Sequence, residues 1–241
     1  MTKEKKTGTF EWAPGLDNCI LGCSNDCLYC FAKQNAVRFH RETEETWPVE
    51  HRNLKAKAKK HKGRVMFPTS HDLHIEHVNW WGPHLLKLLE KGNDVLFVTK
   101  AQMASIEWIC DNLSKYQDQF EIRFTIGAGD EKVREYWEPG APSINERIEA
   151  LDMAYTLGFR VSVSMEPCLM PEPEKFIACF PGDYEIWIGM MNHYSFNPDI
   201  PEEAYQAEIQ GKRNMQRIYE ATKDNPRVRY KDTLRVLLGL V

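Results

Sequence analysis

The stretch Asn18-Cys19-Ile20-Leu21-Gly22-Cys23-Ser24-Asn25-Asp26-Cys27-Leu28-Tyr29-Cys30 holds four of the seven cysteines of the chain. Cys23, Cys27 and Cys30 form a C-x3-C-x2-C pattern. Three thiols this close in sequence suit a soft metal centre, and a single loop of this kind can hold one iron–sulfur cube. A [4Fe–4S] cluster normally takes four thiolates, so three cysteines would leave one iron open to another molecule.

Other roles for these cysteines remain open at this point. Structural zinc would need four ligands, commonly in two separate pairs, whereas the remaining Cys110, Cys168 and Cys179 stand alone. A four-cysteine electron-transfer cluster would recruit Cys19. Inert buried cysteines would not gather so tightly, and an odd cysteine count does not describe a disulfide framework.

Length and composition set the outer bounds. With 241 residues, of which 42% are hydrophobic, the chain can bury a sizeable core. It contains no apolar run near the ~18–20 residues that span a bilayer, and residues 1–6 show no apolar signal segment. We therefore expect no membrane association and a cytoplasmic location. We also expect one core domain over 1–241, with a short tail at 1–8 and a helical extension at 201–241.

Hydrophobic periodicity predicts alternating strands and helices on the C-terminal side of the cysteine loop. Strands are expected at 65–67, 94–99, 120–126, 159–165 and 185–190, with a further one ahead of Cys23. A long amphipathic helix is expected over 204–222. Strands separated by helices predict a parallel α/β sheet, either a partial barrel or an open doubly wound sheet. In both, functional residues lie at the carboxyl ends of the strands.

The cysteine pattern, with Tyr29 just before the last cysteine, resembles the signature of radical S-adenosylmethionine (radical SAM) enzymes. Residues 22–32 are similar to the subgroup around spore photoproduct lyase. The similarity extends through 98–100, 124–126, 138–143 with Arg147, and 164–167, so that it covers about residues 8 to 190. The resemblance implies a partial (βα)6 barrel of the radical SAM type.

The resemblance also implies a reaction and its cofactors. S-adenosylmethionine (AdoMet) binds the open iron of a [4Fe–4S] cluster, and an electron donor such as flavodoxin or ferredoxin reduces that cluster. Reductive cleavage of AdoMet then gives methionine and a 5′-deoxyadenosyl radical, which takes a hydrogen atom from the substrate. The substrate is not identified by the sequence, with a nucleic-acid base or nucleotide among the candidates.

By position, the resemblance assigns cofactor contacts to five residues besides the cysteines. Tyr29 lies beside the adenine. Ser70 stands where many members have a Gly-Gly-Glu stretch, and it would meet the methionine amino group. Lys100 would pair with the methionine carboxylate, Thr125 would contact the ribose or carboxylate, and the backbone at Glu166 would contact the adenine.

Candidate substrate contacts follow two of the expected strands: His71 and Asp72 after the second, and Asn192 and His193 after the last. No catalytic residue is assigned. The H-x2-H-x2-H series over 71–77 drifts around a helix, which argues against a second metal site.

The basic run over 52–64 predicts either a nucleic-acid contact or a solvated face, and the net charge of −4 favours the second. No cysteine occurs at 67–70, and the chain is short, which argues against thymine-dimer repair itself. Two alternatives stay open: an activase that installs a glycyl radical in a partner protein, and a non-enzymatic module that binds nucleic acid through zinc or a cluster. Cys168 and Cys179 follow the fifth strand, where buried apolar cysteine is favoured over a hydrogen relay.

Overall fold

The computed structural model describes residues 8–241, and seven parallel strands form its main sheet. The strands are β1 (Gly15–Leu16), β4 (Val65–Phe67), β5 (Val95–Thr99), β6 (Phe120–Thr125), β7 (Arg160–Met165), β8 (Ile186–Ile188) and β9 (Val228–Tyr230), and they pair in that order. A small antiparallel pair joins β2 (Ile20–Leu21) to β3 (His51–Arg52). The predicted α/β class and partial barrel are confirmed.

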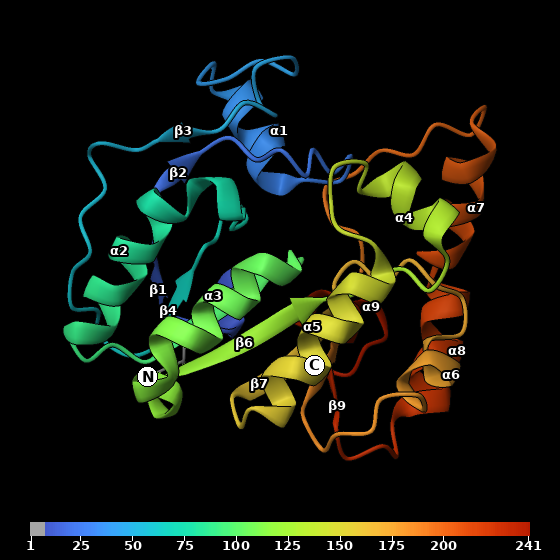
Figure 1. Cartoon of the computed structure of the whole chain (residues 1–241). Helices are drawn as coiled ribbons and strands as arrows, with labels where there is room; N and C mark the ends of the chain where they lie inside the picture. Colours follow the sequence, from blue (N-terminus) through green and yellow to red (C-terminus); the bar gives the residue numbers. More distant parts are fainter. Residues whose placement is uncertain (1–7) are drawn as a thin grey trace, which may run out of the picture.

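Helices follow most strands. They are α1 (Phe31–Arg38), α2 (Val78–Glu90), α3 (Met103–Leu113), α4 (Glu131–Trp137), α5 (Ile144–Thr156), α6 (Pro173–Ile177), α7 (Pro201–Ile209), α8 (Lys212–Thr222) and α9 (Asp232–Leu237), with 3-10 turns η1 (Gly8–Glu11), η2 (Ile75–His77) and η3 (Ser114–Gln119). Figure 1 shows α2, α3 and α5 along one side of the sheet and α1 above the end toward which β4 and β6 point. No helix within residues 8–241 is both long and apolar enough to cross a membrane.

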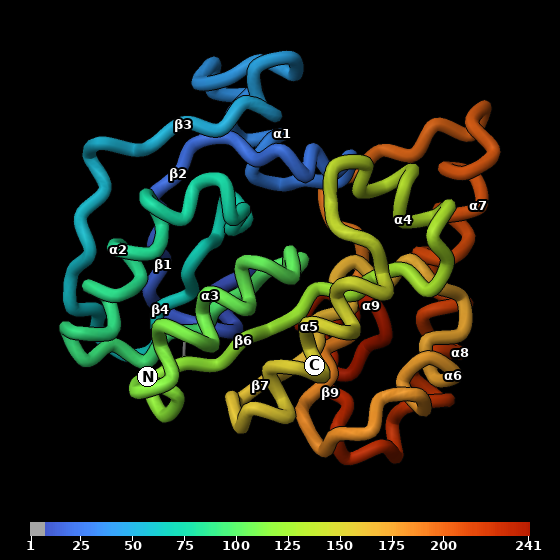
Figure 2. The backbone as a smooth tube through the Cα atoms, viewed as in Figure 1, coloured from blue at the N-terminus to red at the C-terminus, as the bar shows by residue number. Residues whose placement is uncertain are grey.

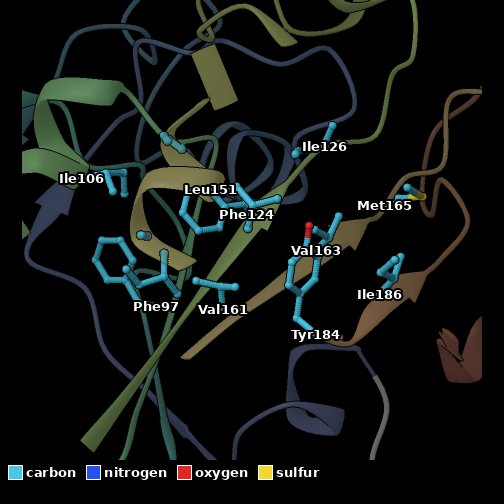
Figure 3. Close-up of a cluster of buried hydrophobic side chains, with 14 of the residues drawn as sticks. Phe97, Ile106, Phe124, Ile126, Leu151, Val161, Val163, Met165, Tyr184 and Ile186 are labelled. Carbon is cyan, nitrogen blue, oxygen red and sulfur yellow. The ribbon is translucent and has the colours of Figure 1, made fainter. Parts of the chain in front are cut away.

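The two faces of each strand have different chemistry, because side chains alternate along a strand. Phe97, Phe124 and Val163 belong to the apolar core that includes helix residues such as Leu151, and Figure 3 shows this cluster. Burying each of these large side chains contributes about 1.5–3 kcal/mol. Side chains that alternate with these core residues along a strand, such as that of Thr125, lie on the opposite face of the sheet. Several of them line the cavity described below.

The C-terminal part differs from the expectation in two respects. The helix expected over 204–222 is two helices, since α7 ends at Ile209 with Gln210 as its C-cap, and Gly211 is the N-cap of α8. The Gln210 side chain holds this break, because it donates to the carbonyl of Cys168 and accepts from the amide of Met191. The 201–241 segment also contributes β9, so it is not wholly helical. The sequence did not predict this strand, because three residues are too few to show the alternation of apolar and polar side chains.

Candidate active site

A cavity of about 650 Å³ opens at the carboxyl ends of the strands, within the size range of ligand pockets. All the predicted site residues line it: Cys23, Cys27, Cys30, Tyr29, Ser70, His71, Asp72, Lys100, Thr125, Glu166, Asn192 and His193. They come from the cysteine loop and from the ends of β4, β5, β6, β7 and β8. The parallel sheet thus gathers into one place residues that are scattered along the sequence.

The cysteine loop is built from two tight turns and a helix cap. The amide of Asp26 donates to the carbonyl of Cys23 at 3.2 Å, and that of Cys30 donates to Cys27 at 3.1 Å. Cys30 then caps α1, where its sulfur accepts from the amide of Lys33 at 3.4 Å. Asp26 adopts the left-handed conformation, with φ of 44°. The loop therefore turns sharply enough to present its three thiols to one cavity.

The donor set fits an iron–sulfur cluster better than a single ion. Among residues 8–241, no group of three His, Cys, Asp or Glu side chains is close enough to hold one metal ion. In a cube each thiolate binds a different iron, so the three thiols stand further apart than ligands of one ion. Burial raises the pKa of Cys27 to about 12, although Lys100 opposes the shift. A bound metal would displace that proton.

Cys19 does not share the cavity with the other three cysteines. It is buried in the apolar core and is not part of the cavity lining. Its amide donates to Nε2 of His71 at 3.2 Å, and burial raises the pKa of its thiol to about 12. This placement argues against Cys19 as a fourth ligand, and hence against the electron-transfer and zinc alternatives that need it.

Asp72 ties the cysteine loop to the end of β5. One carboxylate oxygen accepts from Nδ2 of Asn25 and from the amide of Lys100, both at 2.8 Å. The other accepts from the amide of Leu73 at 2.8 Å and from the hydroxyl of Thr99 at 2.5 Å. Four hydrogen bonds explain why a charge can stay buried here. The structure thus gives Asp72 a supporting role, and its contact with substrate stays a prediction.

The histidine series supports the same loop. His71 is neutral, because burial lowers its pKa to about 4, and its Nδ1 donates to the carbonyl of Asp72 at 2.7 Å. Both of its ring nitrogens are thus engaged, and its substrate contact remains a prediction. His74 lies 2.6 Å from Glu50 and 3.0 Å from Oδ1 of Asn25. Burial alone would lower the pKa of His74, but Glu50 and Asp72 raise it overall.

A buried ion pair, to which the sequence assigned no role, also contacts the cysteine loop. Glu138 and Arg147 are 0% and 1% exposed and approach to 2.6 Å. The hydroxyl of Tyr29 donates to Glu138, and Arg147 donates to the carbonyl of Thr125 at 3.1 Å. The segment resemblance over 138–147 was the only signal of this role.

The loop that contains Glu138 also meets the cysteine loop backbone to backbone. The amide of Gly140 donates to the carbonyl of Asn25 at 3.1 Å, and that of Leu28 donates to the carbonyl of Trp137 at 3.0 Å. A Cβ atom at Gly140 would lie 2.0 Å from the carbonyl oxygen of Ser24. Only glycine fits this approach.

Lys100 offers the cavity a free positive charge. Its ammonium has no hydrogen-bond or ion-pair partner among residues 8–241 and lies 5.6 Å from the centre of the Tyr29 ring. Burial alone would lower its pKa, but Cys27, Glu138 and Asp72 raise it overall. Such a cation in a partly enclosed site calls for an anion on a ligand. Ser70 is also in the lining and is held by its amide, which donates to Asn18 at 2.8 Å.

Behind Glu166, which lines the cavity, lies a second charged group that the sequence did not predict. Lys231, 1% exposed, lies 3.2 Å from Glu11 and 3.6 Å from Glu166 and 4.1 Å from the centre of the Trp12 ring. Burial raises the pKa of Glu166 to about 7. The indole nitrogen of Trp12 and the hydroxyl of Thr233 are buried without a hydrogen-bond partner within residues 8–241. The Glu166 side chain is thus turned toward Lys231.

The sequence is similar to those of uncharacterized proteins. No protein-family model matches the chain. It is 28% identical to an uncharacterized protein of Acidianus two-tailed virus and 25% identical to one of Methanocaldococcus jannaschii, over 64% and 63% of this chain. These matches span 56% and 59% of the relatives, so the chain matches less than two thirds of either.

Solved structures of spore photoproduct lyase share the fold. One, in complex with dinucleoside spore photoproduct, matches 95% of this chain and 79% of its own with a TM-score of 0.58 at 14% identity. A variant with bound AdoMet and the same dinucleoside covers 89% of this chain and 75% of its own, with a TM-score of 0.51 at 13% identity. The chain therefore has the fold of a radical SAM enzyme, and its chemistry must be argued from its own residues.

Proposed function

We propose that this chain is a radical SAM enzyme, with one core domain over 1–241, that holds a [4Fe–4S] cluster on Cys23, Cys27 and Cys30. The observation that carries the proposal is that one cavity brings together three thiols and the ammonium of Lys100, which has no hydrogen-bond or ion-pair partner in the described part of the chain. When bound, the cluster would supply the electron that cleaves AdoMet to a 5′-deoxyadenosyl radical.

The residues of the chain would bind and orient AdoMet beside the cluster. Lys100 pairs with the methionine carboxylate, and the hydroxyl of Ser70 accepts from the methionine ammonium. Thr125 meets the ribose or carboxylate, and Tyr29 lies beside the adenine. A positively charged side chain and a hydroxyl at fixed strand ends would hold the cofactor with little reorganisation.

The substrate would enter the part of the cavity near Glu166, Asn192 and His193. His193 lies 5.8 Å from the ring of Phe31, the first residue of α1, so this region adjoins the cysteine loop. Support for a nucleic-acid base or nucleotide comes from the dinucleoside bound to the structural neighbours. Enclosing walls would keep water from a radical.

The test is anaerobic reconstitution with iron and sulfide, followed by dithionite, AdoMet and an assay for 5′-deoxyadenosine. We expect a reducible cluster and 5′-deoxyadenosine formation in the wild type. Cys27→Ala should lose both, whereas Cys19→Ala, a matched control from the same stretch, should keep both. Lys100→Met should keep the cluster and weaken AdoMet binding. A reducible cluster that never cleaves AdoMet would refute the proposal.

A further inference from the structure

A strip of unpaired positive charge runs along one edge of the molecule. It consists of Arg52, Lys55, Lys57, Lys59 and Lys62, all of which are exposed. None of them has an ion-pair partner among residues 8–241, and the sequence from 51 to 71 contains no Asp or Glu. We call these five residues the basic strip.

The backbone of the segment holds the strip in an extended form. Ala56 and Ala58 pack against the core while the lysines on either side of them point outward. Lys55, Lys57 and Lys59 thus alternate with these two alanines and lie on the solvent side of the segment. Asn93 fixes the segment to the end of α2, because its side chain accepts from His61 at 2.8 Å and donates to Lys59 at 3.0 Å. Figure 2 shows the segment running down the outer side of α2.

The upper end of the strip is continuous with the cysteine loop. Arg52 pairs with Ile20 in the antiparallel β2–β3 pair, and the amide of Asn53 donates to the carbonyl of Cys19 at 2.9 Å. Apolar side chains are exposed on and next to this pair, among them Leu54 at 85% and Leu21 at 48%. A small apolar patch therefore lies at the Arg52 end of the strip, where the segment adjoins the cysteine loop.

We propose that the basic strip docks a small acidic one-electron carrier protein. The inference rests on the proposed function, in which the carrier gives up one electron and is oxidised while the cluster is reduced. None of the strip residues lines the cavity, so the strip does not serve a substrate that must enter the cavity. An electron, by contrast, needs only proximity to the cluster ligands.

Features of the strip favour a protein over a nucleic acid. Residues 49–64 include no Phe, Tyr or Trp, whereas single-stranded nucleic acid is usually held by stacking on such rings. Exposed leucines beside cations suit a transient redox interface, which is small and depends on charge complementarity.

The experiment compares two triple variants of the full chain that change net charge equally. The test variant is Lys55→Glu/Lys57→Glu/Lys59→Glu. The control is Lys132→Glu/Lys212→Glu/Arg213→Glu, at exposed positions on α4 and α8. The probe is a purified acidic flavodoxin, whose binding is measured by fluorescence anisotropy. The rate of 5′-deoxyadenosine formation is measured with reduced flavodoxin and, separately, with dithionite.

We expect the test variant to bind flavodoxin at least about tenfold more weakly than the wild type and to lose flavodoxin-driven turnover by a similar factor. Its dithionite-driven rate should be unchanged, and the control should match the wild type in every assay. Equal flavodoxin binding by the two triple variants would overturn the inference. A test variant that loses binding to a labelled single-stranded oligonucleotide but keeps its binding to flavodoxin would also overturn it. Absence of turnover with dithionite in the wild type would instead refute the proposed function, and the binding data would still decide the docking site.

Discussion

The stability of the cysteine loop should be sensitive to the loss of either charge of the Glu138–Arg147 pair. Glu138→Gln keeps the shape of the side chain and removes its charge, which leaves Arg147 buried without its partner. Breaking a buried pair by neutralising one member costs about 3–5 kcal/mol. We expect a loss of this size, because both side chains are at most 1% exposed and no water can replace the carboxylate.

The contribution of this ion pair to stability can be separated from that of the neighbouring hydrogen bonds. Arg147 keeps bonds to the carbonyls of Pro142 and Thr125 when Glu138 is changed, so its own burial is not relieved. Replacing both members, in Glu138→Gln/Arg147→Met, removes the unpaired charge and should cost less than the sum of the single changes. Tyr29→Phe removes only the hydrogen bond to the carboxylate and should cost about 1.5–3 kcal/mol.

The assay is urea unfolding of the metal-free chain at neutral and acidic pH. Burial alone would raise the pKa of Glu138, but Arg147 and Lys100 lower it overall. The stabilisation is therefore complete above the unfolded pKa and is lost as pH falls through the depressed folded pKa. A cost below about 1 kcal/mol for Glu138→Gln, or strict additivity in the double variant, would refute this reasoning.

Three further predictions follow from single contacts. Gly140→Ala should separate the two loops, because its Cβ would clash with the backbone of Ser24, and iron content after reconstitution should fall while the secondary structure measured by circular dichroism persists. Burial raises the pKa of Glu166 to about 7, so the folded state holds this proton to a higher pH than the unfolded state does. The free energy of unfolding of the wild type, relative to that of Glu166→Gln, should therefore fall by about 3 kcal/mol between pH 4.5 and pH 8 in urea titrations. Cys19→Ala should leave iron content unchanged but lower the melting temperature, as expected for a core residue; loss of iron would make Cys19 a ligand.

Sequence periodicity was enough to predict the sheet and to place the site at its end. The five strands expected after residue 64 are all present within a few residues of their expected bounds, because buried parallel strands have short continuous apolar runs. Residues that directly follow those strands, such as Ser70, Lys100 and Asn192, therefore had to converge. The sequence could predict their location but not the atoms that they contact.

The parts that were missed depend on partners far apart in the chain. Glu138 meets Tyr29 across 109 positions, and Lys231 bonds to the carbonyl of Gly8 across 223. No local pattern encodes such contacts. Asp72 was expected to face the substrate because it follows a strand; that contact stays a prediction, and the sequence did not predict that the carboxylate also joins two loops.

The charges on the two walls of the cavity limit what the substrate can be. On the cysteine side, the ammonium of Lys100 has no ion-pair partner among residues 8–241, and the carboxylate of AdoMet would provide one. At Glu166, which lines the cavity and titrates near pH 7, the buried Lys231 lies against the carboxyl groups of Glu11 and Glu166. Lys231 already has these carboxyl partners and does not line the cavity, so it gives a phosphate no counter-charge there. We therefore expect the part of the substrate that lies beside Glu166 to be neutral or cationic; any phosphate of a nucleotide substrate would have to stay away from this part of the cavity.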